Sequence, residues 1–170
     1  MDRRTGQLTV DSPLGPLRLT SQDGALTVLG WGQAECEASD AVLDETARQL
    51  EAYFAGRLHR FDLPLKPAGT AFRQSVWAAM LAIPYGGTLT YGGVARVLGS
   101  APRAVGGACG ANPIPVIIPC HRILGGGGAP GGYSGQGGLE TKAWLLDLER
   151  RHAPEAAKPV PQAAVQFALL

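Results

Sequence analysis

Apolar and polar residues alternate along the first thirty positions of the chain. The alternation predicts strands over residues 8–10, 17–20 and 25–31, with turn sequences over 11–16 and 21–24 between them. Short strands joined by glycine- and proline-containing turns are typical of hairpins. We therefore expect an antiparallel sheet at the start of the chain.

The period of the apolar positions becomes helical after residue 40. Residues 41–55 place apolar side chains at roughly helical spacing, and Gly56 follows them. We expect an amphipathic helix that lies on the sheet. Residues 61–67 are bounded by prolines and indicate an extended linker, so residues 1–65 form a predicted N-terminal α/β structural domain.

The chain changes character at Gly69, where short helices joined by glycine turns begin. Thr70 is placed to cap a helix that ends before Pro84. The residues of its expected apolar stripe are Phe72, Val76, Trp77, Met80 and Leu81.

Two further short helices follow. Thr90 is placed to cap a helix over 91–98 that stops at Gly99, and Ser100 to cap a third helix over 101–109. Two short helices with a glycine turn between them form a helix-turn-helix pattern. A plain helical hairpin in an enzyme core has the same pattern, so both interpretations stay open from the residues alone.

The third predicted helix carries small side chains beside Arg103. Small side chains allow a close approach to a DNA groove, with Arg103 as the one long side chain to insert, or simply close helix packing. The segment 112–119 follows and contains three prolines, which exclude a central strand. We expect it to be an extended, stiff lead-in that fixes the position of Cys120.

The last predicted helix runs from about residue 139 to 149, with Trp144, Leu145 and Leu148 on its apolar face. Residues 69–150 then form a second domain. The remainder, 151–170, is expected to be a disordered tail.

Charge and cysteine usage narrow the functional classes. Residues 1–68 hold 7 basic and 10 acidic side chains, whereas 69–150 hold 6 and 3, so the second domain is the basic one. This asymmetry favours a polyanionic partner, although ordinary scatter produces differences of this size. Three cysteines without a Cys-x-x-Cys pair predict neither a disulfide framework nor a closed zinc site. No apolar run approaches the length that spans a bilayer, so we expect a cytoplasmic protein without membrane contact.

The candidate chemistry lies in the run 117–122, where Cys120, His121 and Arg122 are adjacent. A thiolate is the attacking form of cysteine, and a neighbouring base or cation raises its fraction at neutral pH. In an extended segment His121 reaches Cys120 only across a bend or through a water. An acidic partner from elsewhere in the chain is needed to orient the imidazole.

A glycine-dense loop, 125–138, follows this run and holds Tyr133 and Ser134. Such a loop is either a flexible linker or a wrap around a flat ligand.

Together, the Cys-His-Arg run, the Arg-Ala-Val-Gly helix, the Tyr-Ser-Gly loop and the final Trp-Leu-Leu helix resemble the O6-alkylguanine-DNA alkyltransferases. The resemblance extends from about Gly69 to Glu149. It implies an α+β fold: a ribonuclease H-like N-terminal domain with a small antiparallel sheet and a helix, then a mainly helical, winged helix-turn-helix C-terminal domain.

The resemblance implies DNA repair by direct reversal, in which Cys120 takes the alkyl group and keeps it as a thioether. His121 resembles the water-linked base and Glu149 the carboxylate that orients it. Arg103 is similar to the finger that enters the base stack, and Tyr91 to the residue that promotes nucleotide flipping and donates a proton. Flipping is needed because a protein sulfur cannot reach O6 of a stacked base in line.

The remaining implied roles concern binding. Ser100 joins Arg103 and Tyr91 at the DNA. The partner is double-stranded DNA that contains O6-alkylguanine, the chain acts as a monomer, and no cofactor or metal is required. The implied residues of the substrate pocket are Asn112, Tyr133, Ser134, Cys109 and Ile123.

Three departures from the family pattern and two rival functions stay open, and the first departure is a short turn before the third helix. The loop Tyr133–Gly138 is longer than the commonest family form, and Cys109 stands where a larger residue is often found, either as a small hydrophobe or as a second oxidisable thiol. One rival is a non-catalytic alkyl-lesion binder or helix-turn-helix regulator, although binding-only relatives lack the cysteine. The other is a cysteine hydrolase that uses Cys120, His121 and Glu149 and requires an oxyanion hole.

Overall fold

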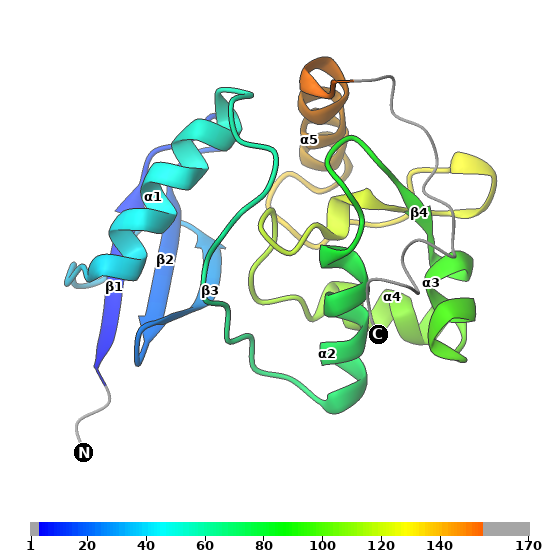
Figure 1. Cartoon of the computed structure of the whole chain (residues 1–170), viewed down its shortest axis with the longest axis horizontal. Helices are drawn as coiled ribbons and strands as arrows, with labels where there is room; N and C mark the ends of the chain where they lie inside the picture. Colours follow the sequence, from blue (N-terminus) through cyan, green and yellow to red (C-terminus); the bar gives the residue numbers. More distant parts are fainter. Residues whose placement is uncertain (1–3, 155–170) are drawn as a thin grey trace. The chain divides into compact units, whose positions relative to one another are not determined.

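The computed structural model describes residues 4–154, and the boundary between its two compact units falls between Ala68 and Gly69. The first unit contains an antiparallel sheet in the order β1-β2-β3 (Figure 1). Its strands are β1 (Thr5–Val10), β2 (Leu17–Gln22) and β3 (Ala25–Trp31). The predicted antiparallel sheet is therefore confirmed.

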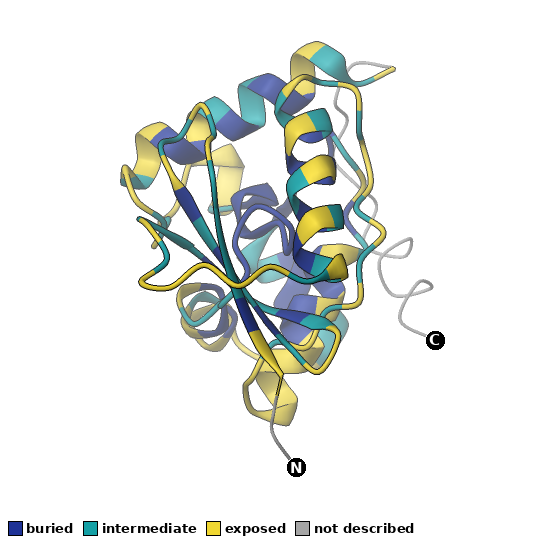
Figure 2. Cartoon of the chain, turned by 90° about the vertical axis from the view of Figure 1, so that its left-hand side faces the viewer, coloured by how far each residue is buried: buried dark blue, intermediate teal, exposed yellow. Residues whose placement is uncertain are grey.

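The core of this unit lies between the sheet and helix α1 (Ala41–Phe54), which contacts all three strands. Asp40 caps the helix by accepting a hydrogen bond from the Leu43 amide at 2.9 Å. Buried positions recur along α1 at helical spacing, as the colouring in Figure 2 shows, and Leu43, Leu50 and Tyr53 are among them. The predicted amphipathic helix is confirmed.

The predicted linker over 61–67 belongs partly to the sheet. The Leu26 amide donates to Pro64 O at 2.8 Å and the Lys66 amide donates to Leu26 O at 2.8 Å, so Leu65 forms a parallel bridge with Leu26. The edge strand β3 needs partners for its backbone groups, and this segment supplies them. The segment is therefore extended, as predicted, but at these residues it also pairs with β3.

The second unit is mainly helical and contains one small parallel sheet that the sequence pattern did not predict. Its helices are α2 (Ala71–Leu81), α3 (Tyr91–Leu98), α4 (Pro102–Gly110) and α5 (Gly138–His152). Strand β4 (Leu89–Thr90) pairs in parallel with β5 (Ile123–Leu124). Two-residue strands carry no period, so only the fold reveals them.

Local capping signals predicted two helix starts correctly. Thr70 accepts from the Arg73 amide at 3.2 Å, and Thr90 accepts from the Gly93 amide at 2.9 Å. Gly99 ends α3 with φ of 62°, a left-handed conformation that a turn between two helices requires.

Two details of the predicted helices were wrong. Ser100 does not cap α4: its amide donates to Ala95 O at 2.8 Å and so closes α3, while Ala101 stands at the N-cap position without a side-chain bond. Pro102 favours this arrangement because the residue before a proline is held extended. On α2 the stripe is narrower than expected, since Phe72 and Leu81 are 36% and 47% exposed.

Helix α5 continues to His152, past the predicted end at residue 149. Residues 151 and 152 of the predicted tail are therefore helical, and residues 155–170 lie outside the described residues. Within residues 4–154, every helix is too short or too polar to cross a bilayer.

Candidate active site

The segment before Cys120 is a wound loop rather than the expected extended lead-in. The Ile118 amide donates to Ile114 O at 2.9 Å, and Val116 between them has φ of 73°. Prolines prevent strand pairing here, but they do not prevent turns. A β-branched residue in the left-handed region costs about 1–3 kcal/mol, so surrounding contacts must hold this loop closed.

Asn112 supplies two of those contacts. Its Nδ2 donates to Ile118 O at 2.9 Å, and its Oδ1 accepts from the Ile114 amide at 3.0 Å. The burial of Val116 and Ile118 also stabilises the loop. Asn112 therefore closes the loop whose end carries Cys120.

Cys120, His121 and Arg122 form a single 3₁₀ turn. In such a turn successive side chains point about 120° apart. The Cys120 side chain consequently points away from its two successors and lines a cavity, while His121 and Arg122 both contact one carboxylate on α5. Of the two routes from His121 to Cys120, a bend or a water, the turn supplies a bend in the backbone.

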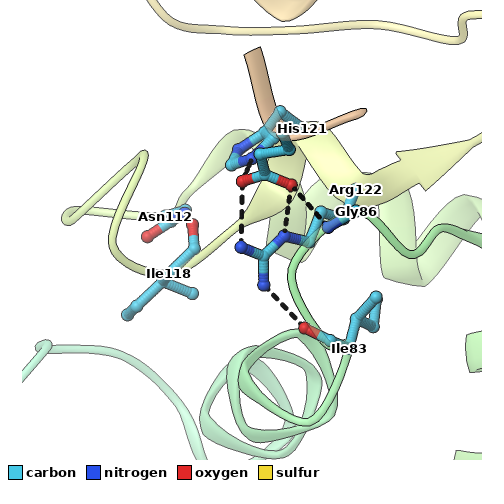
Figure 3. Close-up of polar contacts among 7 residues, drawn as sticks. Ile83, Gly86, Asn112, Ile118, His121 and Arg122 are labelled. Atoms are coloured by element: carbon cyan, nitrogen blue, oxygen red, sulfur yellow. Dashed lines mark hydrogen bonds and ion pairs between the residues drawn. The ribbon is translucent and has the colours of Figure 1, made fainter. Parts of the chain in front are cut away.

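The Glu149 carboxylate binds the two residues that follow Cys120 in the chain, and dashed lines mark these contacts in Figure 3. His121 Nε2 lies 2.7 Å from Oε1, and Arg122 donates from Nη2 to Oε1 and from Nε to Oε2, each at 2.9 Å. The Gly86 amide donates to Oε2 at 3.4 Å, and Arg122 Nη1 donates to Ile83 O at 2.6 Å. The carboxylate thus has donors on both oxygens although its side chain is only 1% exposed.

Opposing forces set the protonation of this pair. Burial alone raises the pKa of Glu149, but the charges and hydrogen bonds of His121 and Arg122 outweigh it and hold that pKa well below its usual range. Burial lowers the pKa of His121, while Glu149 opposes this shift. At neutral pH the site therefore holds an ionised Glu149, paired with Arg122, and a neutral imidazole.

This assignment fixes the tautomer of His121. A carboxylate only accepts, so Nε2 carries the proton and donates to Glu149, and Nδ1 is left as an acceptor. Among the described residues, the buried Nδ1 has no hydrogen-bond partner. A neutral imidazole with a free acceptor nitrogen is the form that can take a proton.

The surroundings of the Cys120 thiol act on its pKa in both directions. Burial raises its pKa, while a hydrogen bond with the Asn112 side chain and the Lys142 ammonium oppose the rise. The resting residue is therefore a thiol, which must lose its proton before it can attack.

The thiol lines a cavity of about 170 Å³. Tyr133 contributes a buried hydroxyl that has no hydrogen-bond partner among the described residues, and burial raises its pKa above the usual value. An unpaired buried hydroxyl in a small cavity is suited to a ligand with a polar edge. The lining residues are Tyr91, Gly106, Cys109, Gly110, Cys120, Gly132, Tyr133 and Ser134.

The sequence argument missed Lys142, which is buried on α5. Its Nζ donates to Ile123 O at 2.6 Å and to Gly132 O at 3.0 Å, and it lies 5.9 Å from the centre of the Tyr91 ring. Burial lowers the pKa of Lys142, while the charges of the two nearby thiols oppose this. Lys142 therefore ties the glycine loop to the end of the Cys120 segment. A single lysine on a helix gives no local signal of burial, because most such residues are solvated.

Arg122 was noted for its position beside the thiol but not as a ligand of Glu149. The pairing joins residues 27 positions apart, and no short-range pattern encodes it.

A wider cavity of about 680 Å³ lies beside the small one and shares Tyr91, Gly106 and Gly132 with it. Arg103 and Arg96 line this cavity, and Arg103 is exposed near the start of α4. Burial raises the pKa of Tyr91, so its hydroxyl stays protonated at neutral pH. The wider cavity therefore offers two cations next to a phenolic proton donor.

The glycine loop reaches this cavity by close packing on Tyr91. Gly131 has φ of 68°, and a Cβ there would lie 2.8 Å from Tyr91 Cε2. Any other residue would push the loop off the ring. The loop is thus a wall of the site at this position and not a free linker.

Six of the predicted site residues do not line the small cavity: His121, Glu149, Arg103, Ile123, Asn112 and Ser100. Ile123 is fully buried in β5, and only its carbonyl oxygen takes part, as the acceptor of Lys142. Asn112 contacts the site through Cys120 and the loop before it. Ser100 is exposed in the turn before α4 and lines neither cavity.

Within residues 4–154, no three His, Cys, Asp or Glu side chains lie close enough together to hold a metal ion. The three cysteines are free, Cys36 exposed and Cys109 and Cys120 buried. The arrangement combines a buried thiol, an oriented neutral imidazole and a narrow cavity. Such a combination suits nucleophilic attack by sulfur on a small, flat ligand.

Two family models match the chain. The one described as "6-O-methylguanine DNA methyltransferase, ribonuclease-like domain" matches residues 8–67, and the one described as "6-O-methylguanine DNA methyltransferase, DNA binding domain" matches residues 71–151.

Individual proteins agree with these models. A methylated-DNA-protein-cysteine methyltransferase of Mycolicibacterium paratuberculosis is 46% identical over 155 residues, which cover 86% of this chain and 93% of that protein. The crystal structure of the Mycobacterium tuberculosis O6-methylguanine methyltransferase has a TM-score of 0.79 at 42% identity, over 89% of this chain and 96% of that one. A crystal structure of M. tuberculosis OGT in complex with DNA has a TM-score of 0.77 at 42% identity, over 92% of this chain and 96% of that one.

Proposed function

The chain belongs to the 6-O-methylguanine DNA methyltransferase family, and on this premise we propose that Cys120 is the residue that accepts the alkyl group. The family membership makes it a methylated-DNA-protein-cysteine methyltransferase, a DNA-binding enzyme that repairs DNA by alkyl transfer. One observation carries the residue assignment: the Cys120 thiol lines a small cavity, and the adjacent imidazole is oriented by Glu149.

The chemistry is a displacement at the alkyl carbon of O6-alkylguanine. The thiol proton moves to His121 Nδ1, by way of a water, and the imidazolium is stabilised by Glu149. Cys120 Sγ forms a bond to the alkyl carbon as the bond from that carbon to guanine O6 breaks. Tyr91 donates its hydroxyl proton to the departing purine, so that the purine leaves as a neutral base.

The product keeps Cys120 as a thioether. A thioether has no easy leaving path, so each molecule acts once and is consumed. The residues named in this mechanism belong to one chain, which supports action as a monomer.

The wider cavity supports a role in DNA binding. We assign Arg103 to the base stack, where it replaces the extruded nucleotide. Tyr91 lines both cavities, and we assign it to promote the rotation of the nucleotide from the stack into the small cavity. Tyr133 and Ser134 then contact the extruded guanine, and the unpaired Tyr133 hydroxyl supports this. Ser100 has no contact that supports a role beyond proximity to the DNA.

A cysteine hydrolase built from the same three residues is less well supported. Acyl transfer needs preorganised N–H donors for the oxyanion, but the Cys120 amide already donates to Ile118 O at 2.8 Å.

Intact-mass measurement after incubation with a duplex that bears one O6-methylguanine tests the proposal. We expect the protein to gain one methyl group, and the Cys120→Ala variant to bind the duplex without gaining mass. Binding by the wild type with no mass change would favour the non-catalytic binder instead.

Arg103→Ala tests the flipping assignment separately. This variant should react more slowly with duplex DNA but at nearly the wild-type rate with free O6-alkylguanine, because only the duplex reaction requires flipping. The matched control is Arg96→Ala, which removes a cation from the same cavity without removing the finger. Equal slowing by both variants would contradict the specific role of Arg103.

A further inference from the structure

The small cavity contains a second thiol that the proposed reaction does not use. Cys109 on α4 and Cys120 on the 3₁₀ turn line the same space of about 170 Å³. The two residues are 7% and 5% exposed, so neither thiol is on the open surface. Cys36, the remaining cysteine, is exposed and belongs to the first unit.

Asn112 connects the two cysteines directly. Its backbone amide donates to the carbonyl oxygen of Cys109 at 3.2 Å, and its side chain forms a hydrogen bond with the Cys120 thiol. One residue therefore contacts the backbone of one cysteine and the sulfur of the other. Asn112 thus links the end of α4, which carries Cys109, to the sulfur of Cys120.

Cys109 lies within electrostatic range of the Cys120 sulfur. Burial raises the pKa of Cys109 to about 12, and a negative charge on Cys120 contributes to the rise. Two thiolates so close together repel each other, so the pair carries at most one negative charge at neutral pH. Disulfide formation requires only one thiolate at a time.

We propose that Cys109 and Cys120 form a reversible intramolecular disulfide when a hydroperoxide enters this cavity. In the first step the Cys120 thiolate attacks one peroxide oxygen, the O–O bond breaks, and with hydrogen peroxide the other oxygen leaves as hydroxide and takes a proton to become water. In the second step the Cys109 thiolate attacks the sulfur of the resulting sulfenic acid, the S–S bond forms, and the sulfenic oxygen leaves as a second water. Two thiols and one hydrogen peroxide thus give one disulfide and two waters.

Local structure leaves room for the sulfurs to approach. Gly106 and Gly110 lie one turn before Cys109 and directly after it and line the same cavity, and a Cβ at either position would meet no atom of another element within 4 Å. Cys109 stands at the last turn of α4, where a helix frays more easily than at its centre. Burial is the largest cause of the raised pKa of Cys109, and the charge of Lys142 opposes it, so Lys142 favours the Cys109 thiolate that must attack.

The consequence for repair rests on the proposed function of Cys120. A disulfide would withdraw the alkyl acceptor and protect it from irreversible oxidation to the sulfinic acid, and a thiol reductant would restore it. Cys109 would thus act as a resolving cysteine for the acceptor.

The test is oxidation of the full chain with hydrogen peroxide, followed by alkylation of free thiols, intact-mass measurement and peptide mapping without reduction. We expect the loss of two hydrogens, a peptide linked through Cys109 and Cys120, and full recovery of free thiols with dithiothreitol. The control, Cys36→Ser, should behave as the wild type.

In Cys109→Ser and Cys109→Ala the linked peptide should be absent, and Cys120 should progress to sulfinic acid that dithiothreitol does not reverse. A wild type that forms sulfinic acid at Cys120 without the linked peptide, or links only Cys36, would overturn the proposal. The linked peptide is observed without any DNA, so its absence is distinct from failure of the reduced protein to accept a methyl group.

Discussion

The Glu149→Gln substitution tests whether the buried carboxylate holds the site together by its charge. The variant keeps the shape of the side chain but leaves the Arg122 guanidinium, whose side chain is 9% exposed, without a compensating anion. Removing one partner of a buried ion pair costs about 3–5 kcal/mol, so we expect a loss of unfolding free energy of that size. The replacement amide also presents an NH₂ group to donors that require an acceptor.

A second substitution separates charge from geometry. In the double variant Arg122→Met with Glu149→Gln, both charges are absent, so the cation is no longer stranded. We expect the double variant to lose about 2–3 kcal/mol less unfolding free energy than the summed losses of the single variants Arg122→Met and Glu149→Gln. His121 still lacks its carboxylate, so the rate of alkyl transfer should remain as low as in Glu149→Gln alone.

The dependence of the unfolding free energy on pH in acid tests the charge of Glu149 independently. The pKa of Glu149 is lowered in the folded state, so its stabilisation is present above the unfolded pKa of about 4.3 and is lost as the pH falls below that value. Urea unfolding should therefore show a shallower loss of stability in acid for Glu149→Gln than for the wild type.

Urea unfolding of the four proteins, with alkyl-transfer rates on the same samples, measures all of these effects. Additive losses in the double variant would refute the buried ion pair. A wild-type transfer rate in Glu149→Gln would refute the role of Glu149 in orienting His121.

Three further substitutions test other parts of the site. Asn112→Ala removes two hydrogen bonds from the loop and should lower the free energy of unfolding in urea by about 1–3 kcal/mol. It should also raise the pKa of Cys120, measured as the pH dependence of thiol alkylation. An unchanged pH dependence would contradict the contact between Asn112 and the thiol. Lys142→Met removes a cation near the thiol and should shift the same profile to higher pH, whereas a shift to lower pH would contradict its electrostatic role. His121→Gln should remove part of the stability loss below about pH 6.5, because the buried imidazole has a lowered pKa and the unfolded state binds its proton first. A pH profile identical to that of the wild type would refute the lowered pKa.

Local chemistry made part of the fold predictable. The caps at Thr70 and Thr90 and the left-handed glycine at Gly99 depend on neighbours within a few residues, and the structure has them where the sequence predicts. Ser100 shows the limit of this reasoning, because a serine next to a helix start can equally belong to the end of the preceding helix.

Contacts between distant residues were not predictable in this way. The pairing of Arg122 with Glu149, the burial of Lys142 and the parallel pair β4-β5 depend on how the elements pack. Glu149 entered the argument through resemblance alone, since a glutamate at the end of a charged helix is usually solvated. The wound loop before Cys120 was missed because prolines exclude a strand without specifying what replaces it.

The most direct test of the central claim is to follow one population of the protein with an excess of DNA that carries isotope-labelled O6-methylguanine. Tandem mass spectrometry then locates the label, and product analysis counts the repaired guanines. We predict that repair stops at one guanine per chain and that all of the label is on Cys120. Label on another residue, or continued repair beyond one guanine per chain, would contradict a Cys120 acceptor that is consumed by its own reaction.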